Sequence, residues 1–136
     1  MTPEEREQLR GLARWAVRFE DPAFSPGQWV PSWTGDDGVI HLGWFDPSAD
    51  MSAFLREAWS NGWAYVFDWM TWAGTPEGRR LIKEPGAIDG AGAQDLFKIL
   101  TTVIRGDRFS EGEIAGAFES GVLTAVARRA GVLAEE

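Results

Sequence analysis

The chain contains no cysteine among its 136 residues. Disulfide bonds, thiolate metal sites and a cysteine nucleophile are therefore excluded together, and the absence fits a reducing cytoplasm. Histidine is almost missing as well, since His41 is the only one. One imidazole cannot build a histidine-rich zinc site, and no G-x-S-x-G motif accompanies it to indicate a serine hydrolase. We interpret His41 as a partly buried, hydrogen-bonded residue rather than a general base.

Long apolar runs are also missing, so the sequence predicts no membrane span. The N-terminus, M-T-P-E-E-R-E-Q, is polar and acidic, unlike a secretion signal. Basic residues are in the minority: 13 Lys and Arg against 21 Asp and Glu give a formal charge of −8. This charge disfavours binding to phosphate backbones and to anionic membranes. We therefore expect a cytoplasmic protein whose partners are neither nucleic acid nor membrane, and no motif predicts a cofactor.

Tryptophan is the abundant residue. All eight tryptophans lie between Trp15 and Trp72, and fourteen of the seventeen aromatic residues fall within the first 72 positions. The apolar fraction of 44% is ordinary for a globular chain. We expect one core with an aromatic first half and an aliphatic second half.

Helical signals recur along the chain and predict a mainly α, compact single domain over residues 1–136, with five or six helices. Thr2 is placed to cap the first helix and Pro3 to occupy its first turn. Further caps are predicted at Ser48 or Asp46, Asp68 and Thr75. Four arginines spaced four residues apart form a slanted ridge on the first helix: Arg6, Arg10, Arg14 and Arg18. We interpret this ridge as a solvated face of the helix. The alternative is a docking surface for an anion or an acidic partner.

A β element is expected within residues 39–67. Residues 20–38 are rich in proline and glycine and predict an irregular segment, pinned to the domain by Phe24, Trp29 and Trp33. Residues 39–45 alternate weakly in polarity and predict a short strand, for which residues 63–67 are the expected partner.

The last third predicts three helices. The first ends near Gly106, and Ser110 is expected to cap the second. Gly112 and Gly116 are expected to allow a neighbouring backbone to approach closely. The third helix is expected to run from Val122 to Ala130, where Gly131 ends it.

Two segments carry the candidate functional residues. In the first, T-T-V-I-R-G-D-R-F-S-E-G at 101–112, Arg105 and Arg108 lie close to Asp107 and Glu111. They form either a bidentate anion site or an ion-pair knot that fixes the corner between two helices. An acid near a helix C-terminus is unfavourable, so Asp107 should have a compensating partner.

The second segment is D-W-M-T-W at 68–72. Asp68 either caps a short helix or faces a pocket walled by Trp69 and Trp72. Paired carboxylates beside tryptophan platforms would suit glycoside hydrolysis. Asp107, Glu111 and Glu113 could hold only a hard cation.

The two segments in this order, with A-F-E-S-G-V-L after them, resemble the bacterial and archaeal domain-of-unknown-function family 6508 over residues 39–130. The resemblance implies a small, mainly helical bacterial domain without an assigned activity, and it supplies no catalytic residue. In that family the residue after D-R-F-x-E-G is commonly His, whereas this chain has Glu113.

The leading hypothesis is a non-enzymatic binding or regulatory module. Its expected ligand is a protein or a small anion, and the chain is expected to be a monomer or homodimer. The predicted cleft joins eight residues: Asp68, Trp69, Trp72, Arg105, Asp107, Arg108, Glu111 and Glu113. A small carboxylate-dependent hydrolase or transferase is the alternative. A phage or mobile-element inhibitor with an acidic surface is the third hypothesis.

Overall fold

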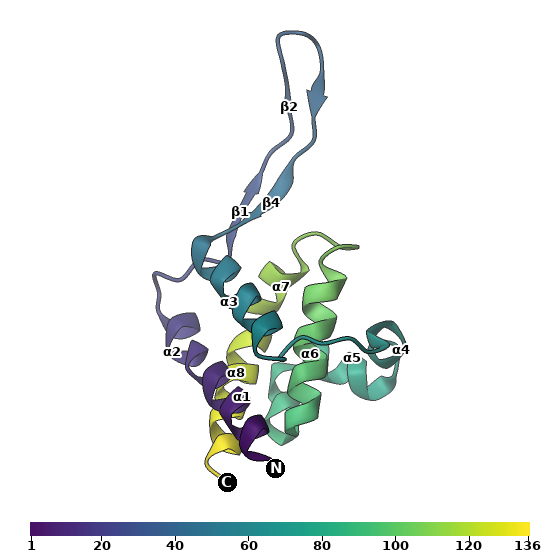
Figure 1. Ribbon diagram of the computed structural model, residues 1–136. Helices are drawn as coiled ribbons and strands as arrows, with labels where there is room; N and C mark the ends of the chain where they lie inside the picture. The colour runs from purple at the N-terminus through teal and green to yellow at the C-terminus, as the bar shows by residue number, and fades with distance from the viewer.

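Eight α-helices and one long β-hairpin appear in the computed structural model, which describes residues 1–136 (Figure 1). The helices are α1 (Pro3–Ala13), α2 (Trp15–Glu20), α3 (Ala49–Ser60), α4 (Trp69–Ala73), α5 (Pro76–Lys83), α6 (Ala93–Gly106), α7 (Glu113–Glu119) and α8 (Val122–Ala134), with a 3-10 turn η1 (Pro85–Gly90). The mainly α prediction is confirmed. There are more helices than the expected five or six, because the N-terminal helix divides at Arg14 and residues 69–83 form two short helices.

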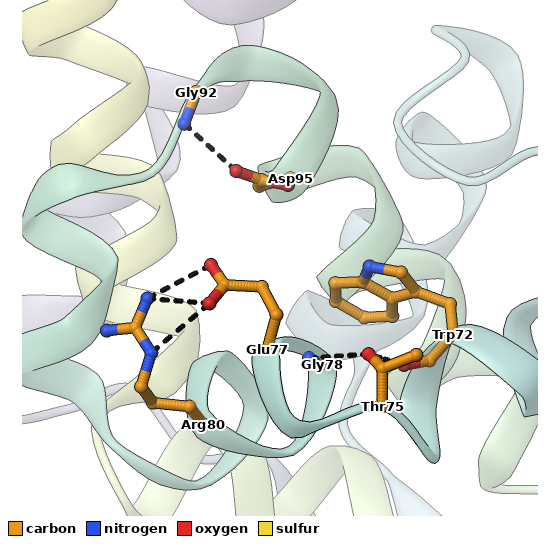
Figure 2. Close-up of polar contacts among 7 residues, drawn as sticks. All are labelled: Trp72, Thr75, Glu77, Gly78, Arg80, Gly92 and Asp95. Atoms are coloured by element: carbon orange, nitrogen blue, oxygen red, sulfur yellow. Dashed lines mark hydrogen bonds and ion pairs between the residues drawn. The ribbon is translucent and has the colours of Figure 1, made fainter.

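The predicted helix caps are confirmed at Thr2, Ser48 and Thr75. Each hydroxyl accepts a hydrogen bond from the backbone N–H three residues later, at 3.0 Å. Such bonds satisfy N–H groups that have no partner inside the helix. Figure 2 shows that the Thr75 hydroxyl also donates to the Trp72 carbonyl, at 2.6 Å, which ties the start of α5 to the end of α4.

A single cluster of 25 buried apolar residues forms the core. Its largest members from the first half are Trp15, Phe54 and Trp63, whereas the second half contributes mainly aliphatic side chains from α6 and α8. Helix α8 packs against α1, α2 and η1. The predicted division into an aromatic and an aliphatic half is therefore present in the core.

The hairpin projects away from the helical body (Figure 1). Strand β1 (Gly27–Val30) pairs antiparallel with β4 (Trp44–Pro47), and further out β2 (Trp33–Thr34) pairs with β3 (Ile40–His41). The turn follows Gly35, whose N–H donates to the Val39 carbonyl at 2.9 Å. We call residues 27–47 the arm.

Two expectations about this region are wrong. The strand at residues 39–45 pairs with residues 27–34 and not with residues 63–67, which form no strand. Phe24 packs against Phe19 and Phe118, and the mostly exposed Trp29 lies against Gly112, so these two aromatics pin residues 20–38 to the domain as expected. Trp33 does not, because it is exposed further out on the arm. Prolines and glycines in residues 20–38 conceal the strand pattern, because they interrupt the ladder without ending it.

The C-terminal helix also differs from expectation. Gly131 does not end α8, which continues to Ala134. Gly131 has no positive φ angle and lies against Ala13, where a small residue lets α1 and α8 pack closely. None of the eight helices combines the length and apolar character that crossing a bilayer requires.

Candidate functional site

Five of the eight predicted site residues lie at the α6–α7 corner, which we define as residues 105–113. Asp107 organises this corner: its Oδ1 accepts the N–H of Gly112 at 3.1 Å and of Ile114 at 3.2 Å. These bonds satisfy the start of α7, so Asp107 performs the capping role expected of Ser110. The predicted compensating partner of Asp107 exists, and it is backbone N–H rather than arginine.

The ion-pair knot does not form. None of the ion pairs within 4.0 Å involves Arg105, Arg108, Asp107 or Glu111. Arg108 is exposed, and Arg105 is half-buried with a buried Nε that has no hydrogen-bond partner. Buried polar atoms are nearly always paired, so this Nε is an unusual feature of the corner.

The corner also holds the base of the arm. Glu111 Oε1 accepts the backbone N–H of Phe45 in β4, at 2.5 Å. Gly112 has a φ of 90°, and a Cβ there would overlap the indole of Trp29 in β1. The positive φ and the close approach both require glycine at this position. The group that approaches Gly112 is a side chain and not the expected neighbouring backbone, and Gly116 has open space around it, so the expected backbone approach is wrong at both glycines.

Glu113 is a partly buried acid at the start of α7. Burial raises the pKa of its carboxyl, and the nearby Asp107 carboxylate raises it further. Its carboxylate lies about 3.2 Å from where a Cβ on Gly106 would stand. Glu113 is therefore packed on the last turn of α6.

An aromatic contact joins the D-W-M-T-W segment to the corner. Asp68 caps α4: its Oδ2 accepts the Thr71 hydroxyl at 2.7 Å, and its Oδ1 accepts the Thr71 N–H at 3.3 Å. Both bonds lower the pKa of the Asp68 carboxyl below its usual range, and the bond from the Thr71 hydroxyl has the larger effect. Trp69 contacts Phe109, with ring centroids 6.1 Å apart. Trp72 is half-buried against the core.

The cavities near these residues are separate. An open cleft of about 440 Å³ is lined by Lys83, Glu111 and Glu113 among others. A smaller cavity of about 70 Å³ lies between the base of the arm, α3 and the corner. Asp68, Trp69, Trp72 and Arg105 line none of the five main cavities. The structure thus brings the two segments together without joining their eight residues around one of these cavities.

No group of three or more His, Cys, Asp or Glu side chains is arranged to hold a metal ion. The hard-cation site considered for Asp107, Glu111 and Glu113 is therefore not formed. His41 is half-buried, as expected, but in place of the expected side-chain hydrogen bond it stacks on Trp33, with ring centroids 3.9 Å apart.

The arm is the structural feature that sequence reasoning missed. Its large apolar side chains are exposed by 47% to 80%, in order along the chain Trp29, Trp33, Val39, Ile40, Leu42 and Trp44. No Lys or Arg occurs between Arg18 and Arg56, whereas Asp36 and Asp37 lie at the tip. The clustering of tryptophans around the turn at Asp36-Asp37-Gly38 is the signal that could have located it.

Comparison with curated proteins finds no match, and comparison with solved structures finds none either. A family model described as a family of unknown function matches residues 4–136. This match extends the resemblance at residues 39–130 through the N-terminal helices and the whole arm. The chain belongs to the protein family DUF6508.

Proposed function

We propose that the protein is a non-enzymatic protein-binding module whose recognition element is the arm. The observation that carries this proposal is the exposure of six large apolar side chains on a hairpin that projects from the body (Figure 1). Exposed apolar clusters of this kind mark interaction surfaces. An isolated two-stranded hairpin is only marginally stable in water, so a surface that covers it would also stabilise it.

The residue types on the arm support recognition of a protein. Tryptophan is enriched among the residues that dominate binding energy at interfaces, and Trp29, Trp33 and Trp44 are all partly exposed. The base is anchored by Glu111 and by Trp29 on Gly112, which gives the arm a defined direction. A pre-oriented element loses less entropy on binding than a free loop.

Charge narrows the class of partner. The arm has three aspartates and no Lys or Arg, within a chain of net charge −8. Electrostatic complementarity favours a partner surface that is apolar at its centre and basic at its rim. An acidic inhibitor that occupies a basic site would be one form of this function. We place the protein in the cytoplasm, which fits its lack of cysteine.

A carboxylate-dependent hydrolase or transferase is the second candidate, and Glu113 is the observation that favours it. Its raised pKa and its position on a cleft shared with Glu111 are features of a general acid. However, one oxygen each of Asp107 and Glu111 accepts backbone N–H groups, which supports structural roles for both. We therefore rank catalysis below binding.

Affinity capture from cells that express the protein tests the proposal. The arm variant Trp33→Ser/Leu42→Ser should lose any stoichiometric partner that the wild type retains. A matched control, Val17→Ser/Val66→Ser, removes two highly exposed apolar side chains outside the arm and should retain the partner. Retention of the same partners by the arm variant would contradict the proposal.

A further inference from the structure

A groove of about 670 Å³ lies between α1 and the end of α8, on the ridge of arginines seen in the sequence. Its lining combines small residues with charged ones: Arg6, Arg10, Ala13, Arg14, Gly131, Ala134 and Glu135. We call it the arginine groove. It has the chemistry that the arm requires, since guanidinium groups surround a floor of small apolar residues.

Two of its arginines are loosely held. Arg10 and Arg14 approach Glu7 at 3.6 and 3.9 Å, and their side chains are mostly exposed. Exposed ion pairs of this kind contribute little to stability, so these guanidinium groups can exchange partners at small cost. Arg6 differs, because it donates to the backbone carbonyls of Ala134 and Glu136. Arg10 and Arg14 are thus the residues free to bind an acidic ligand.

The tip of the arm carries the complementary groups. The Asp36 carboxylate can accept paired hydrogen bonds from a guanidinium group, which are among the strongest in proteins. Asp37 Oδ1 accepts the Val39 N–H at 2.9 Å, which leaves its Oδ2 to accept a bond from a ligand. Trp33 lies beside the tip with more than half of its surface exposed, although His41 stacks on one face of its ring. An arginine over a tryptophan face gains a further cation–π attraction.

We propose that the arm of one copy docks into the arginine groove of a second copy. This inference rests on the proposed function of the arm and names its partner. Within one molecule, the arm projects from the end of the body opposite to the chain termini, beside which the groove lies (Figure 1). The contact is therefore head-to-tail, and repeated contacts give a ring if the rotation closes and a short filament otherwise.

The contact is expected to be weak. The exposed parts of Trp33, Val39, Ile40 and Leu42 amount to on the order of 500 Å², below the roughly 800 Å² per partner of a standard interface. We expect micromolar affinity and a marked loss of association at high salt, because exposed charges are screened.

Sedimentation velocity over a range of micromolar concentrations tests the proposal. The average mass of the wild type should rise with concentration and fall when salt is added. The groove variant Arg10→Gln/Arg14→Gln and the arm variant Trp33→Ser/Leu42→Ser should each stay monomeric. The control Arg56→Gln/Arg80→Gln removes two exposed arginines outside the groove, one of them paired with a glutamate on its own helix, and should associate like the wild type. Thermal unfolding of every variant verifies that it is folded.

Mixing the two variants separates a head-to-tail contact from other contacts. The groove variant keeps its arm and the arm variant keeps its groove, so the mixture should form a one-to-one dimer and nothing larger. A wild type that stays monomeric, or a groove variant that associates as well as the wild type, would overturn the proposal. If the wild type is monomeric but arm-dependent capture of another protein persists, only the choice of partner fails. If arm-dependent capture is lost as well, the proposed function fails with it.

Discussion

Asp107 connects the end of α6 to the start of α7 through one carboxylate oxygen. A position that is unfavourable at the C-terminus of one helix becomes favourable at the N-terminus of the next. Glu111 performs a comparable role for the arm, since it accepts the N–H of Phe45. Asp107 and Glu111 thus fix the backbone at the start of α7 and at the base of the arm, respectively.

Replacing Asp107 with alanine should destabilise the protein by about 0.5–2 kcal/mol, the usual cost of removing a helix cap. Chemical denaturation measures this change. Ser110→Ala is the matched control, because the Ser110 hydroxyl makes no capping bond, and it should leave the free energy of unfolding nearly unchanged. A larger loss from Ser110→Ala than from Asp107→Ala would show that the cap has been misassigned.

Replacing Glu113 with glutamine should change how stability depends on pH. The pKa of Glu113 is raised above its ordinary value of 4.5, so the folded state holds a proton that the unfolded state has already released. The wild type therefore loses stability as pH rises from the unfolded pKa through the folded pKa. Below that window this contribution is fully present.

Thermal unfolding of both proteins across that window measures the effect. The melting temperature of Glu113→Gln, relative to the wild type, should rise between acidic and neutral pH. A relative melting temperature that stays constant, or that falls with pH, would contradict the raised pKa.

The elements divide into a packed body and an arm that contributes nothing to the core. None of the 25 core residues comes from residues 27–47. The arm is nevertheless positioned by two contacts at its base, from Glu111 and from Trp29 on Gly112. This division explains how an element can be directional without being needed for the fold.

Shortening the arm tests this division. Replacing residues 32–41 with a two-residue Asn-Gly turn should change the free energy of unfolding by less than about 1 kcal/mol, because only surface residues are removed. Denaturant titration provides the value. A loss of several kcal/mol would place the arm within the cooperative unit of the body.

The helices were predictable because their signals are local. Caps such as Thr2, Asp68 and Thr75 act three residues away, within one turn. The pairing of β1 with β4 was not predictable, because it joins residues 20 apart at one end of the ladder, Gly27 and Pro47, across prolines and glycines. The cap of α7 was missed because Asp107 reaches Ile114, seven residues on, through a turn that Gly112 makes possible.

The candidate site was partly predictable for the same reason. The sequence indicated both segments, and the contact of Trp69 with Phe109 brings them together. Charge alone could not tell whether Arg105 pairs with Asp107, because backbone N–H groups compete for the same carboxylate. Exposure of the arm could not be read from composition, since buried and exposed tryptophans look alike in a sequence.

The two ends of the molecule differ in chemistry. The acidic, aromatic arm projects from one end and the arginine groove lies toward the other, near the two chain termini (Figure 1). The six large apolar side chains of the arm each stay at least 47% exposed in the monomer. Both proposals follow from this arrangement, and both require that the arm contacts another protein molecule.

Site-specific photocrosslinking in living cells tests that requirement most directly. A photoreactive amino acid replaces Leu42 on the arm or, as the control, Val17 on α2, since both side chains are highly exposed. If the arm contacts another protein, position 42 should give a discrete crosslinked protein adduct and position 17 none. The absence of an adduct from position 42, or the same adducts from both positions, would contradict an arm that binds a protein.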